Sequence, residues 1–238
     1  PVRVLFFSSI STRNFLIFHI YAISFFGLLC YTFSKNKKGG VPMTTKIYEP
    51  LKLFFYASLI NLILILIPSA DNAFFDLLIS FIGIAAGIIS LYALYRMRDI
   101  SSHLRGAFNF SVLGMLVSLL FTVISTFNAD SGFAIGMILF FSILALGFAL
   151  FSVIANYHFY WGLDELIETN GYHYPLGRIK WCFYISIIST VVVLFVEFAA
   201  GSGWLTQFLS FAASGVQLYL FYGYLQAVRT REEQTPLL

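Results

Sequence analysis

The feature that most constrains this chain is a series of apolar runs, each about as long as the roughly 20 residues a helix needs to cross a bilayer core. Only 11% of the residues are charged and 59% are hydrophobic, with a mean hydropathy of +0.86. A soluble domain carries about 25% charged residues, and helices without a polar face have nothing to present to water. The sequence therefore predicts an all-α integral membrane protein and excludes a water-soluble core.

From Met43 onward, the sequence predicts six transmembrane helices. Three connections, at 69–72, 128–132 and 201–203, are very short and contain no Lys or Arg. Every basic residue after Met43 lies at the opposite ends of the predicted spans, and so on the other side of the membrane. Because positive residues gather on the cytoplasmic side, both termini are predicted to be inside, in a bacterial cytoplasmic membrane. The predicted spans are Leu53–Ala70, Ala73–Tyr95, Ala107–Phe127, Phe133–Asn156, Trp181–Ala200 and Trp204–Leu225.

Residues 1–42 form a distinct segment ahead of this six-helix domain, which covers 43–238. The run Lys37-Lys38-Gly39-Gly40 back-translates to a purine-rich stretch resembling a bacterial ribosome-binding sequence at a normal distance from a start at Met43. One interpretation is that 1–42 is translated upstream DNA; the alternative is an extra span over 14–33, which is apolar enough to insert. Mass spectrometry of the native N-terminus distinguishes the two.

The six spans group into three similar helical hairpins, 51–98, 104–160 and 178–228. Each opens with a basic residue, followed by Phe at +3, Tyr or Asn at +4 and Ser at +6, and each closes with Tyr-x-x-Tyr. Interfacial aromatic and basic residues are common in membrane proteins, but they do not explain the shared register. We therefore predict an internal threefold repeat. Its closing tyrosines form a predicted partner face: Tyr92, Tyr95, Tyr157, Tyr160, Tyr219 and Tyr222.

Two further sets of residues are candidates for binding and packing. Carboxylates at or near the non-basic ends suggest a cation or ligand vestibule, against the simpler interpretation of solvated helix ends; they are Asp71, Asp76, Asp130 and Glu197. Small residues recur in the second helix of each hairpin, where they let helices approach closely; they are Gly83, Gly87, Gly132, Gly136 and Gly215. Mid-span polar residues such as Ser58 and Asn61 are expected to hydrogen-bond within or between helices.

The segment 157–180 is the longest polar interruption and holds the residues that most resemble catalytic groups. They are His158, Asp164, Glu165, Glu168 and His173. Their spacing matches no metal-ligand signature, and Cys30 and Cys182 add no metal pair or disulfide framework. The favoured interpretation is a short amphipathic helix on the inner membrane surface, with Trp161, Leu163, Leu166 and Ile167 in the interface and its end at Asn170-Gly171. We predict no metal, no cofactor and no catalytic residue.

The functional expectation is a non-enzymatic membrane protein with a structural, regulatory or sensory role through partners. The partners are the lipid bilayer and either a membrane protein or a second copy of the chain, and not nucleic acid. The alternative is a passive permease or channel for a small solute or ion along the pseudo-threefold axis. A weak third option is an intramembrane enzyme that uses the acids and histidines of 157–180.

Overall fold

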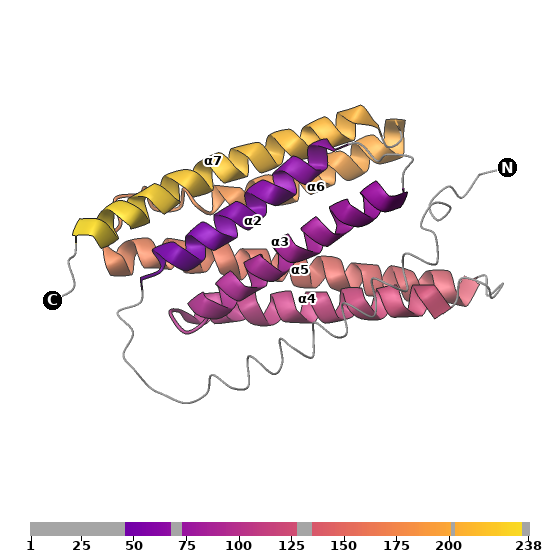
Figure 1. Cartoon of the computed structure of the whole chain (residues 1–238), viewed down its shortest axis with the longest axis horizontal. Helices are drawn as coiled ribbons and strands as arrows, with labels where there is room; N and C mark the ends of the chain where they lie inside the picture. Colours follow the sequence, from indigo (N-terminus) through magenta and orange to yellow (C-terminus); the bar gives the residue numbers. More distant parts are fainter. Residues whose placement is uncertain (1–45, 68–72, 128–134, 201–202, 235–238) are drawn as a thin grey trace.

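The computed structural model describes residues 46–67, 73–127, 135–200 and 203–234, and this part of the chain contains helices and no strands (Figure 1). Four helical stretches are long and apolar enough to cross a membrane: Tyr48–Leu66, Ile143–Asn170, Trp181–Ala199 and Trp204–Gln234. The predicted all-α fold is thus confirmed for the described residues. The helices are α2 (Tyr48–Leu66), α3 (Ala73–Met97), α4 (Ser102–Phe127), α5 (Ile135–Asn170), α6 (Trp181–Ala200) and α7 (Trp204–Gln234). The predicted upstream segment, 1–42, lies outside the described residues.

The predicted separate helix in 157–170 is wrong. No helix-breaking proline separates Asn156 from Asn170, so α5 continues unbroken through this stretch and ends at Gly171, whose φ of 64° suits a glycine. Leu163, Leu166 and Ile167, which we expected in the membrane interface, are instead fully or almost fully buried against other helices. Their spacing places them on one face of a longer helix, and that face packs against other helices of the protein.

The helices follow one another in a ring. Each helix packs against the next one along the chain, and α7 packs against α2 and closes the ring. Figure 1 shows α6 and α7 along one side, α4 and α5 along the opposite side, and α2 and α3 between them. Contact is most extensive between α4 and α5 and least extensive between α5 and α6.

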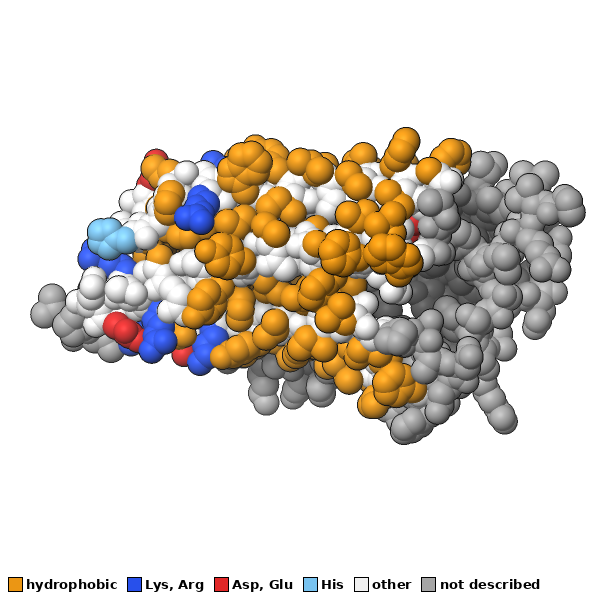
Figure 2. Space-filling view, turned by 90° about the horizontal axis from the view of Figure 1, so that it is seen from above, with side chains coloured by type: hydrophobic (Ala, Val, Ile, Leu, Met, Phe, Trp, Pro, Cys, Tyr) orange, Lys and Arg blue, Asp and Glu red, His pale blue; other side chains and the backbone are white. Residues whose placement is uncertain are grey.

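The buried core is confined to one end of this ring, which we call the basic end because Lys52, Arg105, Lys180 and Arg229 lie there. Figure 2 shows the Lys and Arg side chains gathered toward this end of the visible face. The cluster of buried apolar residues, which we call the basic-end core, includes Ile47, Leu51, Leu94, Met97, Leu104, Phe159, Leu163, Tyr224 and Val228. Each of the six described helices contributes at least one residue to this core, and the contribution of α6 is Cys182.

Away from the basic end, the helices present apolar side chains outward. Phe195 and Phe198 of α6 are 72% and 93% exposed, and Figure 2 shows a continuous hydrophobic surface over this part of the visible face. Lipid is as apolar as these side chains, so their exposure costs nothing in a bilayer. The distribution fits helices that cross a membrane and pack most tightly where they leave it.

Aromatic pairs join the helices at the three junctions α3–α4, α5–α6 and α7–α2. Ring centroids lie 5.7 Å apart for Tyr95 and Phe108, and 5.9 Å apart for Tyr157 and Phe183. At the closing junction, Phe55 lies 5.8 Å from Tyr222. In each pair a phenylalanine near the start of one helix meets a tyrosine of the preceding helix in the ring. Such tilted or edge-on contacts contribute about 0.5–1.5 kcal/mol beyond their burial.

Two glycines permit the close approach of α4 and α5 at the basic end. A Cβ atom on Gly162 would lie 2.9 Å from Leu104 Cγ, and one on Gly106 would lie 2.9 Å from His158 Nδ1. The predicted packing glycines lie in more open places: a Cβ on Gly83 would make an ordinary contact with Leu64 at 3.7 Å, and Gly87 and Gly215 have nothing within 4 Å. Gly132 and the surroundings of Gly136 lie outside the described part.

Alanine substitutions at two glycines are expected to change stability in opposite directions. Gly162→Ala overpacks the α4–α5 contact and should lower the free energy of unfolding by about 1–3 kcal/mol. Gly215→Ala meets open space within a helix and should raise it by about 1 kcal/mol, because alanine is the better helix former. Unfolding in mixed micelles, followed by circular dichroism, measures both. A loss at Gly215 accompanied by a smaller oligomer would instead place this glycine at a contact between copies.

Candidate functional site

A buried carboxylate ties the connection between α5 and α6 to the basic-end core. Asp164, 8% exposed, places one oxygen 2.7 Å from Lys180 Nζ and accepts a 2.7 Å hydrogen bond from the Gly177 backbone with the other. Gly177 has a φ of 75°, which favours glycine. Lys180 also lies over the ring of Trp161, with Nζ 5.0 Å from its centroid. Asp164 is therefore a structural anchor whose charge is already neutralised.

Tyrosines hold α7 to this anchor. Tyr224, fully buried, donates a 3.0 Å hydrogen bond to the Leu163 carbonyl, and Tyr174 donates a 2.9 Å bond to the Leu220 carbonyl. Tyr172 and Tyr174 both meet the Tyr224 ring edge-on. Burial raises the pKa of Tyr172 and of Tyr174 to about 12, so both phenols stay protonated at physiological pH and keep their hydrogen bonds.

The ring is also closed by a hydrogen-bonded cap between its first and last helices. Glu232, near the end of α7, accepts backbone hydrogen bonds from Ile47 at 2.7 Å and Tyr48 at 3.0 Å. These N–H groups belong to the start of α2, where a helix has no internal acceptors and carries a partial positive charge. A displacement of α7 therefore acts directly on α2.

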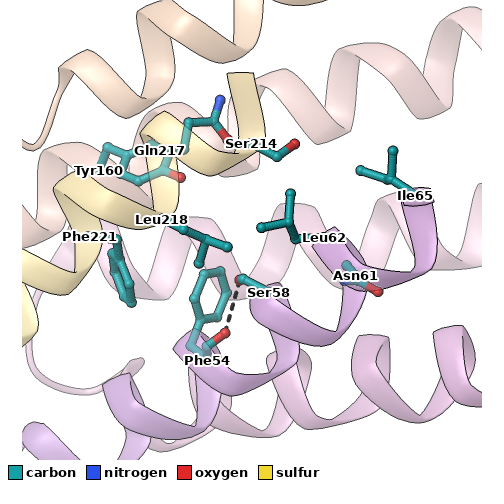
Figure 3. A pocket seen from close by; sticks show the side chains of 10 residues that line it. All are labelled: Phe54, Ser58, Asn61, Leu62, Ile65, Tyr160, Ser214, Gln217, Leu218 and Phe221. Atoms are coloured by element: carbon teal, nitrogen blue, oxygen red, sulfur yellow. Dashed lines mark hydrogen bonds between the residues drawn. The ribbon is translucent and has the colours of Figure 1, made fainter. Parts of the chain in front are cut away.

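Beyond the basic-end core lies a hollow of about 190 Å³ between α2, α7 and one residue of α5 (Figure 3). Half of its lining is apolar: Phe54, Leu62, Ile65, Leu218 and Phe221. The other half is polar but uncharged: Ser58, Asn61, Tyr160, Ser214 and Gln217. Apart from Tyr160, these residues lie in α2 and α7, two of the helices that are long and apolar enough to cross a membrane.

The hollow ends at the core. Phe54 and Phe221 line it, and their rings lie 5.7 Å apart and within 4.5 and 6.1 Å of Phe159, a core residue. Immediately toward the basic end stand Leu51 and Leu163, both with no exposed surface. Among the described residues, the hollow therefore has no open path through the basic end.

The acids and histidines of 157–180 do not come together. Asp164 pairs with Lys180, whereas His158 Nδ1 lies 3.1 Å from His103 Nδ1 on α4, with one ring nitrogen donating to the other. Glu168 and His173 are exposed. No group of three or more metal-ligating side chains occurs in the described part of the chain. The weak enzyme hypothesis required these groups to converge, and their placement gives it no support.

The predicted acidic vestibule is only partly described. Glu197 is exposed on α6, near its end. Asp76 lies in the first turn of α3, but its side chain is not described, and Asp71 and Asp130 lie outside the described residues. The vestibule stays a prediction.

The six tyrosines of the predicted partner face divide into two sets. Tyr92, Tyr219 and Tyr222 are exposed, and Tyr219 most of all, at 70%. The other three make contacts within the chain: Tyr95 lies under the Arg98 guanidinium at 4.1 Å, Tyr157 packs on Trp161 with centroids 4.2 Å apart, and Tyr160 lines the hollow. Only the exposed set is available to a partner.

Sequence reasoning named Ser58 and Asn61 as mid-span polar residues that hydrogen-bond within or between helices and predicted no hollow; the Asn61 side chain makes no such bond among the described residues. Ser58 was expected to bond back to its own helix, and its hydroxyl does donate to the Phe54 carbonyl at 2.9 Å. Gln217 was overlooked, although a long amide in the middle of an apolar span is a usable signal. Its Nε2 donates a 3.2 Å hydrogen bond to the Cys182 carbonyl at the start of α6.

Comparisons of the chain with models of protein families, with curated proteins and with solved structures find no match in any of the three. Its function is therefore inferred from the geometry and chemistry above.

Asp164→Asn should destabilise the fold strongly. The change leaves the Lys180 ammonium in a largely buried place without its counter-charge, and breaking such pairs costs about 3 kcal/mol. Glu165→Gln, one residue away and exposed, is the matched control and should change the free energy of unfolding by less than about 0.5 kcal/mol. Equal effects of the two substitutions in mixed-micelle unfolding would contradict the role of Asp164 as an anchor.

Proposed function

We propose that this chain is a six-span bacterial membrane protein made of three repeated hairpins, with its basic end in the cytoplasm. The orientation rests on the distribution of Lys and Arg. Burial at corresponding positions supports the repeat: Leu51, Leu104 and Ile179, which precede the basic residue of each hairpin, all have 0% exposed surface. The third residues of the Tyr-x-x-Tyr motifs are buried as well; they are Leu94, Phe159 and Phe221.

The aromatic pairs at the junctions add a cyclic pattern to this support. The opening phenylalanine of the second hairpin meets a closing tyrosine of the first, and the third hairpin meets the second in the same way. Phe55 of the first hairpin then meets Tyr222 of the third. A threefold repeat arranged around an axis accounts for a phenylalanine–tyrosine contact at each junction, made by the second tyrosine of the motif at Tyr95 and Tyr222 and by the first at Tyr157.

The role we propose is regulatory or sensory and non-enzymatic. The observation that carries it is the blind end of the hollow: a small molecule can occupy the middle of the bundle but meets the basic-end core instead of a way through. A molecule bound there contacts Phe54 and Phe221, which also pack within or against that core. Binding can therefore favour one packing of the core over another, which is how a ligand shifts a conformational equilibrium.

Such a sensor would transmit its signal by changing its interaction with a partner at the cytoplasmic end. Tyr219 and Tyr222 are exposed on α7, the helix that both lines the hollow and caps α2 through Glu232. Tyrosines are frequent anchors of protein interfaces because they bury a large area with few rotatable bonds. The partner is another membrane protein or a second copy of this chain.

A passive permease is the second candidate, and the polar lining of the hollow favours it. Transport through the ring would require residues such as Leu51, Phe159 and Leu163 to separate, since they fill its basic end. The two roles thus differ in whether the solute leaves on the far side.

Purified protein in liposomes should not accelerate the entry of small neutral solutes such as glycerol or butyramide. Stopped-flow light scattering measures the rate, and protein-free liposomes are the reference. Asp76→Asn and Glu197→Gln should leave this baseline unchanged. A rate well above the reference would favour the permease, and its loss in either variant would place the acidic vestibule on the path.

A photo-crosslinking amino acid at position 219 or 222 should give a discrete protein adduct in intact cells, because these side chains are exposed at the proposed partner face. Position 188 is the matched control, since Ile188 is exposed in the middle of α6, where lipid is expected. An adduct of twice the chain mass would identify a second copy as the partner. The same lipid-only pattern at all three positions would contradict the partner face.

A further inference from the structure

The lining of the hollow restricts what can bind in it. Among the residues that the structure describes, no Lys, Arg, Asp, Glu or His contributes to its wall. A charged group at membrane depth costs at least about 2.5–3.5 kcal/mol, and a ligand ion would find no opposite charge here to offset this. The occupant is therefore uncharged.

The polar half of the wall demands hydrogen bonds. Gln217 uses Nε2 on the Cys182 carbonyl, which leaves its side-chain oxygen as an acceptor, and Ser58 donates its only proton to Phe54 and can then only accept. Within the described residues, the side chains of Asn61 and Tyr160 make no hydrogen bond. Because unsatisfied polar groups at membrane depth are costly, an occupant with both donors and acceptors fits better than an acyl chain.

The volume of the hollow and the apolar half of its wall further restrict which molecule can bind. An apolar cavity of about 150 Å³ holds benzene, so this hollow of about 190 Å³ takes a molecule of roughly six to eight non-hydrogen atoms. Leu62, Ile65 and Leu218 offer contact to a short alkyl segment. We propose that the hollow is a binding site for a small neutral alcohol or amide, with Asn61 and Gln217 as its hydrogen-bonding groups. The inference deepens the sensory role proposed above by naming the ligand class.

Protection of a cysteine placed in the hollow tests the site directly. Ser214→Cys, in a Cys30→Ser background and in nanodiscs, is modified by a small neutral thiol reagent; the native Cys182 is fully buried and is checked in the background alone. Butyramide and 1,4-butanediol are the neutral probes, and butyrate and butylammonium are their charged counterparts. Val216→Cys, exposed on the outer surface of the same helix, is the matched control.

A neutral probe at about ten times its Kd should slow the modification of Ser214→Cys about tenfold and leave Val216→Cys unchanged. The charged probes should not protect. Asn61→Leu removes a side chain that has no hydrogen bond to lose within the described residues, so it should keep the fold and weaken protection. Gln217→Met loses the hydrogen bond to the Cys182 carbonyl as well as the acceptor in the hollow and should also weaken protection. Circular dichroism verifies both folds.

The inference is overturned if charged and neutral probes protect alike, if protection survives both substitutions, or if neither neutral probe protects and only water or a lipid chain occupies the hollow. These outcomes leave the cross-links at positions 219 and 222 unaffected. The ligand class and the partner role can therefore fail separately.

Discussion

The structure depends on where apolar surface can be removed from water. At 1.5 Å per residue, the 36 residues of α5 extend about 54 Å and the 31 residues of α7 about 46 Å, well beyond a hydrocarbon core of about 30 Å. Burial stabilises packing where water is the alternative and contributes little between helices in lipid. In a bilayer, we therefore expect the core where these helices extend past the hydrocarbon region, and we expect the middle of the bundle, which gains less from close packing there, to retain a hollow.

Polar contacts then fix which helices meet at that core. Asp164 joins α5 to the segment before α6, Tyr224 joins α7 to α5, and Glu232 joins α7 to the start of α2. Each links residues distant in sequence, and each satisfies a backbone group or charge that would otherwise be buried without a partner. Helices that could slide past one another on apolar contacts alone are thereby held in one register, with α7 at the centre of the network.

Composition and the length of the apolar runs predicted the helical membrane fold, because both follow from the solvent that each residue prefers. The stop at Asn170-Gly171 was predictable for a local reason, because glycine readily adopts the positive φ that ends a helix, and Gly171 has a φ of 64°. The continuation of α5 through Trp161–Glu168 was not, because its polar residues resemble a surface helix and the buried face becomes apparent only when α4 and the other neighbouring helices pack against it. The pairing of Asp164 with Lys180 and the role of Gln217 depend on packing across elements, which no local pattern reveals.

Two residues that line the hollow depart from the proposed repeat. Counting from the basic residue of each hairpin, Asn61 corresponds to Gly114 and Ser189, and counting from the closing tyrosines, Gln217 corresponds to Ser90 and Ala155. In the proposed repeat, Asn61 and Gln217 therefore place long amides where the other two units have small residues, and both amides line the hollow between α2 and α7. If the three hairpins are copies of one unit, their shared residues contribute to the basic-end core, whereas these two residues distinguish the α2–α7 junction, where the hollow lies.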